Sequence, residues 1–93
     1  MVVAIQTKFE KELRKTPDHI QDQARIVIGK LMAASSLETA GVDYKMMKGQ
    51  KKGRGFYRIR VGDYRIGIQY LHPDVIIMRV LHRGKVYGAF PPK

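Results

Sequence analysis

The chain of 93 residues contains no cysteine, few acidic residues and no long apolar run. Without cysteine, disulfides and thiolate zinc sites are excluded, and a reducing compartment poses no redox problem. Apolar stretches such as Val75 to Met78 are far shorter than the roughly 20 residues of a membrane-spanning helix. The N-terminus also lacks a basic region followed by an apolar one. We therefore expect a soluble cytoplasmic protein with no membrane partner, folded as one domain over residues 1–93.

Acidic residues are scarcest in the second half of the chain. The composition is 18 Lys and Arg against 8 Asp and Glu, a formal net charge of +10. Residues 1–44 hold equal numbers of both signs, whereas in residues 45–93 only Asp63 and Asp74 oppose the basic side chains. Such clustering predicts a polyanionic partner, either nucleic acid or an acidic protein, in preference to generic solubility.

The N-terminal half is predicted to form a short strand and two helices. A β-prone segment, Val2–Gln6, precedes a capping-box pattern that begins with Thr7 and would start a helix running to about Lys15. Thr16 as N-cap, with Pro17 at the first helical position, predicts a second helix that ends near residue 34. The apolar stripe of this helix would cover a sheet; it consists of Ile20, Ala24, Val27, Ile28 and Leu31.

The C-terminal half is predicted to be a run of strands. They are expected at Phe56–Val61, Tyr64–Tyr70 and Val75–Leu81, and Tyr44–Met47 is a short strand or an extended segment. A glycine-rich basic loop, Lys48–Gly55, precedes the first of the three. This order predicts an α+β domain, in which an N-terminal strand and two helices pack on one face of an antiparallel sheet of about four strands.

The hairpin formed by residues 56–66 carries the strongest functional signal. If the Gly62-Asp63 turn pairs Val61 with Tyr64, Arg60 lies directly opposite Arg65. Opposed like charges destabilise a sheet, so an anion is expected on that face, and phosphate suits the guanidinium fork. A solvated face with scattered charges is the alternative. Alternation adds Arg58 to the same face and leaves the apolar residues buried, namely Tyr57, Ile59, Val61, Tyr64, Ile66 and Ile68.

The third strand is apolar on both sides, so alternation alone does not determine which side faces inward. We expect Ile76, Met78 and Val80 to face inward, because this puts Arg79 outward. Arg83, immediately after the strand, would then join the same cationic surface.

The residues after the third strand bring acid-base chemistry within reach of the arginines. His82 offers an imidazole and Tyr87 a phenol, while Arg83 and Lys85 add positive charge. The competing interpretations are a strand-end histidine without a catalytic role and a tyrosine that only packs against the sheet. The three histidines have no ligand spacing, so we expect neither a metal nor a cofactor.

The basic loop superficially resembles a phosphate-binding loop. It lacks the Lys-Ser/Thr ending and precedes a strand instead of linking a strand to a helix, so we reject a nucleotide site. Contact with a nucleic-acid backbone and a disordered surface loop remain equally open.

The hairpin, together with Lys48-Gly49, Val80-Leu81-His82-Arg83 and Val86-Tyr87, resembles the RelE toxins of the RelE/ParE superfamily over nearly the whole chain. The resemblance implies the toxin of a type II toxin-antitoxin pair. Such a toxin is a metal-independent endoribonuclease, an mRNA interferase that cuts messenger RNA in the ribosomal A site by 2′-hydroxyl attack and so inhibits translation. The implied partners are the ribosome, mRNA and a cognate acidic RelB-like antitoxin.

By motif position, the resemblance assigns Arg58 and Arg60 to the paired cations of the strand, Arg65 to the arginine after the hairpin and Arg83 to the arginine after the last strand. Tyr87 matches the tail tyrosine, which orients the base or assists proton transfer. Some members have lysines where this chain has arginines, and a guanidinium is a poor general base. We therefore expect the arginines to hold phosphate, and His82 or Tyr87 to move the proton.

The other cations of the second half are expected to contact RNA; they are Lys45, Lys48, Lys51, Lys52, Arg54, Arg79 and Lys85. Two alternatives remain: a ParE-like, non-catalytic inhibitor of DNA gyrase, and a plain nucleic-acid-binding module. Residues 88–93 look too short and proline-rich for the additional C-terminal helix that some family members carry.

Overall fold

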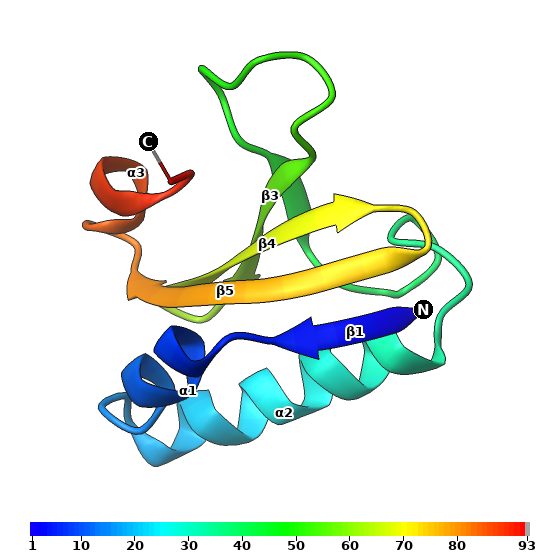
Figure 1. Cartoon of the computed structure of the whole chain (residues 1–93). Coiled ribbons are helices and arrows are strands. Elements are labelled where there is room, and N and C mark those ends of the chain that lie inside the picture. Colours follow the sequence, from blue (N-terminus) through cyan, green and yellow to red (C-terminus); the bar gives the residue numbers. More distant parts are fainter. Residues whose placement is uncertain (93) are drawn as a thin grey trace.

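The computed structural model describes residues 1–92, and Lys93, the last residue of the expected domain, lies outside the described residues. The elements are β1 (Val2–Ile5), α1 (Thr7–Leu13), α2 (Asp18–Ala33), β2 (Tyr44–Met46), β3 (Phe56–Val61), β4 (Tyr64–Leu71), β5 (Asp74–His82) and α3 (Val86–Ala89). The strands form one sheet in the order β1-β5-β4-β3-β2. α1 and α2 cover one face of this sheet, and α3 lies on the other side (Figure 1). None of the described helices is long and apolar enough to cross a membrane.

The predicted α+β class is confirmed, with a difference in the sheet. It has five strands instead of about four, and it is mixed because β1 runs parallel to β5. The chain leaves β1 through α1 and α2 and returns through β2, so that the first strand lies beside the last (Figure 1). Strand propensity alone could not indicate this pairing, because β1 and β5 are far apart in the sequence.

The predicted hairpin register is confirmed. Val61 pairs with Tyr64 and Arg60 with Arg65 across β3 and β4. Gly62 has a φ of +57°, the left-handed conformation that a tight hairpin turn requires. The register therefore follows from the turn and from the alternation of the two strands.

The main core lies between the sheet and the two N-terminal helices. α2 contributes Ile20, Ala24 and Leu31, with Val27 and Ile28 partly buried beside them. The sheet side of this core is formed by Ile59, Val61, Ile66, Ile68, Val75, Ile77 and Val80, all at most 4% exposed. The predicted inward face of β3 and β4 is confirmed, and its tyrosines, Tyr57 and Tyr64, pack at the margin.

The predicted orientation of β5 is wrong except at Val80. A bulge interrupts the ladder between β4 and β5, so that Ile68 pairs with Ile77 and Gly67 pairs with Arg79. Met78 is the extra residue, and it packs on the opposite face of the sheet. Before the bulge, the inward residues are Val75 and Ile77 in place of Ile76. A bulge adds one residue to a strand, which reverses the alternation and cannot be seen in a strand that is apolar on both sides.

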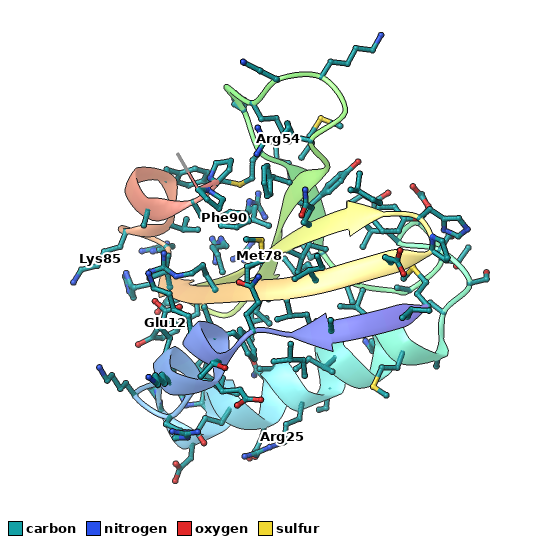
Figure 2. The ribbon with its side chains drawn as sticks, viewed as in Figure 1. Glu12, Arg25, Arg54, Met78, Lys85 and Phe90 are labelled. Atoms are coloured by element: carbon teal, nitrogen blue, oxygen red, sulfur yellow. The ribbon has the colours of Figure 1, made fainter. Side chains whose placement is uncertain are left out.

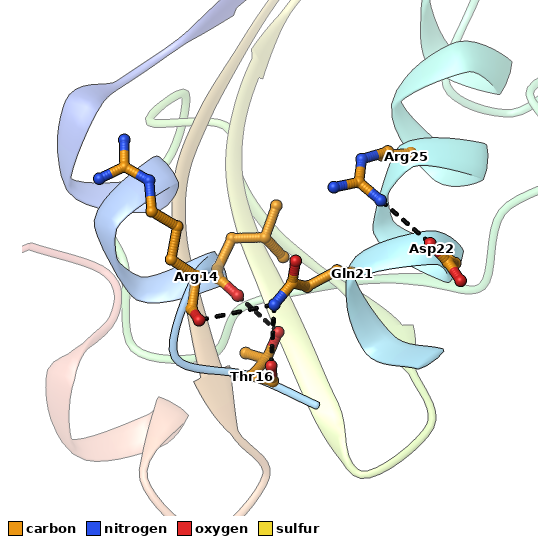
Figure 3. Close-up of polar contacts among 6 residues, drawn as sticks. Arg14, Thr16, Gln21, Asp22 and Arg25 are labelled. Carbon is orange, nitrogen blue, oxygen red and sulfur yellow. Dashed lines mark hydrogen bonds and ion pairs between the residues drawn. The ribbon is translucent and has the colours of Figure 1, made fainter. Parts of the chain in front are cut away.

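The two predicted N-caps do not cap. α1 begins at Thr7 with Gln6 as its N-cap, and α2 begins at Asp18 with Pro17 as its N-cap. The hydroxyl of Thr16 instead donates to the carbonyl of Leu13 at 2.7 Å, and the amide of Gln21 donates to the carbonyl of Thr16 at 3.0 Å (Figure 3). Thr16 is therefore buried in the connection between the helices.

A second, smaller core lies on the other face of the sheet. Met47, Phe56, Val86 and Phe90 are buried there, with Met78 and Leu81 packed against them. Val86 belongs to α3, a helix of four residues that ends before the prolines of the tail. This helical turn folds back over the sheet (Figure 2).

Candidate nucleic-acid interface

Four cations project from the sheet on the side opposite α1 and α2. Arg60 is paired with Arg65 across β3 and β4, and Lys45 is paired with Arg58 across β2 and β3. We call the surface formed by these four residues the cationic face. Like charges that lie directly opposite each other destabilise a ladder, and here two such pairs are adjacent. The local structure therefore places positive charge where the isolated fold gains no stability from it.

Two guanidinium groups of the cationic face are partly withdrawn from solvent. Nε and Nη1 of Arg58 and Nε of Arg65 are buried and have no hydrogen-bond partner among the described residues. Arg65 uses Nη1 to donate to the carbonyls of Gly62 and Tyr64, both at 2.9 Å. Its remaining donors are held in a fixed position. Buried, unpaired charged donors are costly, and a bound anion or a catalytic role is among the reasons for which a protein retains them.

The electrostatics of Arg65 show which groups surround it. Burial lowers the pKa of Arg65, and the positive charges of Arg58, Arg60 and Arg83 lower it further. The phenol of Tyr87 acts in the opposite direction on that pKa. Arg65 is therefore the centre of a cluster that includes the expected arginines and the tail tyrosine.

Arg83 and Tyr87 border the cationic face and keep much of their surface free. The backbone N–H of Arg83 donates to the carbonyl of Asp63 at 2.8 Å, which ties the end of β5 to the hairpin turn. The Arg83 side chain is 3.9 Å from the Asp63 carboxylate, and both are well exposed, so this pair contributes little. Tyr87 is 65% exposed at its place on α3. Its ring is available to a ligand on the cationic face.

The expected location of His82 beside the arginines is wrong. His82 pairs with Tyr64, and the two rings meet edge to face at 5.5 Å on the side of the sheet that packs against the helices. Leu81, the preceding residue, is the one that shares a face with Arg65. Nδ1 of His82 accepts a hydrogen bond from the N–H of Gly84 at 3.2 Å. His82 lies two residues after the inward-facing Val80, so the alternation of the strand turns the imidazole away from the cationic face.

Arg79 also differs from its expected role in the cationic surface. It makes a two-pronged ion pair with Glu12 of α1, with distances of 2.9 Å from Nε and 2.7 Å from Nη2. The hydrogen bonds to Glu12 raise the pKa of Arg79. Oε1 of Glu12 also accepts from the backbone N–H of Val80 at 3.3 Å, beyond the end of β1. Figure 2 shows Glu12 close to β5. Arg79 thus joins a helix to the sheet and is not free to contact RNA.

A pocket of about 350 Å³ opens beside the cationic face. We call it the tail pocket, because Tyr87, Phe90 and Pro91 form one wall; its other lining residues are Lys45, Met46, Met47, Lys48 and Arg58. Two of the expected RNA-binding lysines, Lys45 and Lys48, thus lie with Arg58 and Tyr87. All the charged side chains in the lining are positive.

A second pocket of about 250 Å³ adjoins the first and shares Pro91 with it. We call it the loop pocket, because the basic loop forms one wall; it is lined by Gly49, Gln50, Lys51, Arg54, Phe56, Pro91 and Pro92. Arg54 lies between the loop and the tail in Figure 2, above Phe90. The structure therefore separates the loop cations, since Lys51 and Arg54 line this pocket and Lys52 does not.

The basic loop is held at its base by one side chain. The amide of Gln50 donates to the carbonyls of Met47 and Phe56 at 2.6 and 2.8 Å, and its oxygen accepts from the N–H of Phe56 at 2.9 Å. Gly55 has a φ of +74°, and a Cβ there would collide with the carbonyl of Tyr70. The loop is thus anchored to β3 and β4.

The remaining expected RNA contacts lie at the periphery. Lys52 is exposed in a turn of the basic loop. Lys85, exposed before α3, points away from the molecule (Figure 2). Among residues 1–92, no three His, Asp or Glu side chains gather closely enough to hold a metal ion.

Residues that build the site without carrying charge escaped the sequence reasoning. Phe90 and Gly67 set the position of the tail, and Gln50 closes the loop. A glycine that interrupts a strand of alternating residues is a signal for close packing, and Gly67 is such a glycine. An amide side chain within a basic loop offers no comparable signal.

The fold and the clustered arginines beside an exposed tyrosine agree with the comparisons to known proteins, which define a toxin of a type II toxin-antitoxin system. Residues 3–87 match the family described as "ParE toxin of type II toxin-antitoxin system, parDE", and the chain belongs to this family.

A relative and several solved structures extend the likeness. The chain is 38% identical over 91 residues to Toxin RelE3 of Methanocaldococcus jannaschii, which covers 98% of this chain and 100% of the relative. A RelB-RelE antitoxin-toxin complex from Methanococcus jannaschii superposes with a TM-score of 0.77 at 36% identity, covering 95% of this chain and 99% of that one. An archaeal RelE-RelB complex from Pyrococcus horikoshii OT3 shares the fold, with a TM-score of 0.68 at 22% identity and coverage of 91% and 97%. The resemblance to RelE toxins is thereby confirmed.

Proposed function

We propose that this toxin is a metal-independent endoribonuclease that cleaves messenger RNA in the ribosomal A site and thereby inhibits translation. The observation that carries the proposal is the pair of partly buried guanidinium groups of Arg58 and Arg65. Their buried nitrogens have no hydrogen-bond partner among the described residues. A phosphate diester of RNA fits donors in this geometry.

The arginines stabilise the negative charge that develops on the phosphate during the reaction. The ribose 2′-hydroxyl attacks the adjacent phosphorus, and the bond to the 5′-oxygen of the next nucleotide breaks, which leaves a cyclic phosphate and a free 5′-hydroxyl. Negative charge on the phosphate oxygens increases in the transition state. Arg58, Arg60 and Arg65 are held on adjacent strands and need little rearrangement to stabilise it. Arg83, at the border of the cationic face, adds to the same field.

Tyr87 is assigned one of two roles, stacking on a nucleobase or transferring a proton. Its exposed ring stands beside the cationic face, where it can stack on a nucleobase, and its hydroxyl can exchange a proton with the reacting oxygens. The position of His82 against Tyr64, on the other face of the sheet, supports no role in proton transfer. Among the two residues expected to move the proton, Tyr87 is therefore the candidate.

The partners follow from charge and from the relatives. The structures of the relatives from Methanococcus jannaschii and Pyrococcus horikoshii are complexes with a RelB antitoxin. We infer that this chain likewise pairs with a RelB-like antitoxin, acidic enough to oppose its net charge of +10. The ribosome and mRNA are the further partners, and the cytoplasm is the compartment in which the toxin meets them.

Primer extension on cellular messages after brief induction of the toxin tests the proposal. New 5′ ends inside translated codons are expected within minutes of induction, and they should be absent when Arg65 is replaced by Met. Lys15→Gln, an exposed charge change after α1, is the matched control and should leave the ends unchanged. Growth arrest without new ends would overturn the proposal.

A second candidate is a ParE-like inhibitor of DNA gyrase, because the matching family is described by the name ParE. The identity of 38% with Toxin RelE3 over nearly the full chain favours the ribonuclease. Supercoiling by purified gyrase in the presence of the toxin separates the two. Inhibited supercoiling together with intact messages would favour the gyrase inhibitor.

A further inference from the structure

The loop pocket has the character of a binding site, although it lies beyond the cationic face. The charged residues in its lining are Lys51 and Arg54, and both are positive. It is separated from the tail pocket by Pro91, which lines both. Its volume is about 250 Å³. The two pockets therefore form consecutive hollows along one positively charged groove between the basic loop and the tail.

Arg54 is prepared for a planar ligand. Its guanidinium carbon lies 5.3 Å from the centroid of the Phe56 ring, and this ring is braced on another side by Phe90, edge to face at 5.5 Å. The Arg54 carbonyl accepts from the side chain of Gln69 at 2.9 Å, and its N–H donates to the Lys51 carbonyl at 3.3 Å. These two bonds hold the backbone of Arg54, and a guanidinium beside an aromatic ring can stack on a base or form a fork with a phosphate.

We propose that the loop pocket binds the nucleotide next to the one held in the tail pocket, so that Pro91 separates two successive nucleotides of a single RNA strand. This inference rests on the proposed function, because it takes RNA as the ligand of the cationic face. Lys51 and Arg54 contact the phosphate or the base of this neighbouring nucleotide. Lys52, on the same loop but outside the pocket lining, makes no such contact.

Binding of short RNAs tests the subsite without requiring cleavage. The probes are fluorescent RNAs with 2′-O-methyl groups at every position, which blocks 2′-hydroxyl attack, in a series extended by one nucleotide at either end. For the wild type, one extension is expected to raise the affinity about tenfold. It should also increase the slope of log affinity against log salt by about 0.7, the value for one phosphate on a single strand.

Arg54→Ala and Lys52→Ala form a matched pair, because each removes one charge from the same loop. Arg54→Ala should abolish the tenfold increment, and Lys52→Ala should retain it. Arg54→Lys, which keeps the charge but not the planar fork, should recover the salt slope and not the full affinity.

The outcomes separate this inference from the proposed function. If the RNAs bind and the binding needs Arg58, but Arg54→Ala and Lys52→Ala behave alike, the subsite is wrong and the proposed function stands. If none of the probes binds even at low salt, the subsite is wrong, and the proposed function is decided separately by the primer extension on cellular messages. Circular dichroism of each variant shows whether a loss of affinity comes from loss of the fold.

Discussion

The ring of Phe90 packs directly onto Gly67 at the centre of the sheet. A Cβ placed on Gly67 would lie 2.9 Å from three atoms of this ring, and Phe90 is only 1% exposed. Among the tail residues that the structure describes, Val86 and Phe90 are buried, so this contact holds α3 against the cationic face. The absence of a side chain at one position of β4 therefore decides where Tyr87 stands.

Replacing Gly67 with Ala is expected to displace the tail. The added methyl group must push Phe90 away, and overpacking of this kind costs about 1 to 3 kcal/mol of unfolding free energy. Cleavage should fall with the displacement of Tyr87. Urea denaturation and the rate of mRNA cleavage on programmed ribosomes measure the two effects. Gly88→Ala is the control, because a Cβ there meets nothing within 4 Å; equal stability of the two variants would contradict the argument.

Glu12→Gln should lower the stability by about 1 to 2 kcal/mol, because it leaves Arg79 partly buried with a weaker partner. Because Glu12 raises the pKa of Arg79 in the folded protein, Arg79 stays charged and the ion pair contributes its full stability at every pH below the ordinary titration range of arginine. This contribution is lost only as the pH rises through the raised pKa of Arg79. The loss relative to wild type should therefore be the same at about pH 7 and about pH 10. Chemical denaturation at both pH values checks this, with Glu10→Gln on the exposed side of α1 as control. A difference that shrinks by pH 10 would show that the pair is not what stabilises the contact.

Arg60→Gln is expected to stabilise the free toxin at low salt. It removes the charge directly opposite Arg65, and relief of such a pair is worth about 0.5 kcal/mol. It should also relieve part of the depression of the Arg65 pKa, to which Arg60 contributes after burial and Arg58. Thermal unfolding at low and high salt measures the effect, which should shrink as salt screens the repulsion. Lys15→Gln is the comparison, and an equal gain there would mean that only net charge matters.

Tyr87→Phe and His82→Gln should differ in their kcat for mRNA cleavage on programmed ribosomes. If Tyr87 moves the proton, Tyr87→Phe lowers kcat by about 100-fold, since a positioned general acid or base contributes that much or more. If Tyr87 only stacks, the phenyl ring retains activity and Tyr87→Ala is the damaging variant. His82→Gln should retain kcat, because the imidazole lies against Tyr64. A large loss of kcat in His82→Gln would instead assign the proton transfer to His82.

The candidate site was partly accessible from the sequence because its centre is local. The turn at Gly62 and strict alternation place Arg58, Arg60 and Arg65 on one face, without help from the rest of the fold. Lys45 escaped this reasoning as a partner of Arg58, because β2 reaches β3 only across the basic loop. The pockets escaped it as well, since each is formed by the loop and the tail together.

The errors of the sequence-based prediction concern the N-caps of the two helices and the orientation of β5. Thr7 and Thr16 fit capping patterns, yet the N-caps of the two helices are the adjacent residues Gln6 and Pro17. The reversal of β5 follows from a bulge that no pattern in an apolar strand reveals.

By itself, the sequence determined the α+β class, the register of the hairpin and the concentration of positive charge on one face of it. These depend on turn geometry, on a period of two along a strand and on composition, all of which act over a few residues. Only the tertiary structure decided that β1 lies beside β5, that Glu12 holds Arg79, and that Phe90 rests on Gly67. Those relationships join segments far apart in the chain, and their energy comes from burial and pairing that exist only once the sheet has formed.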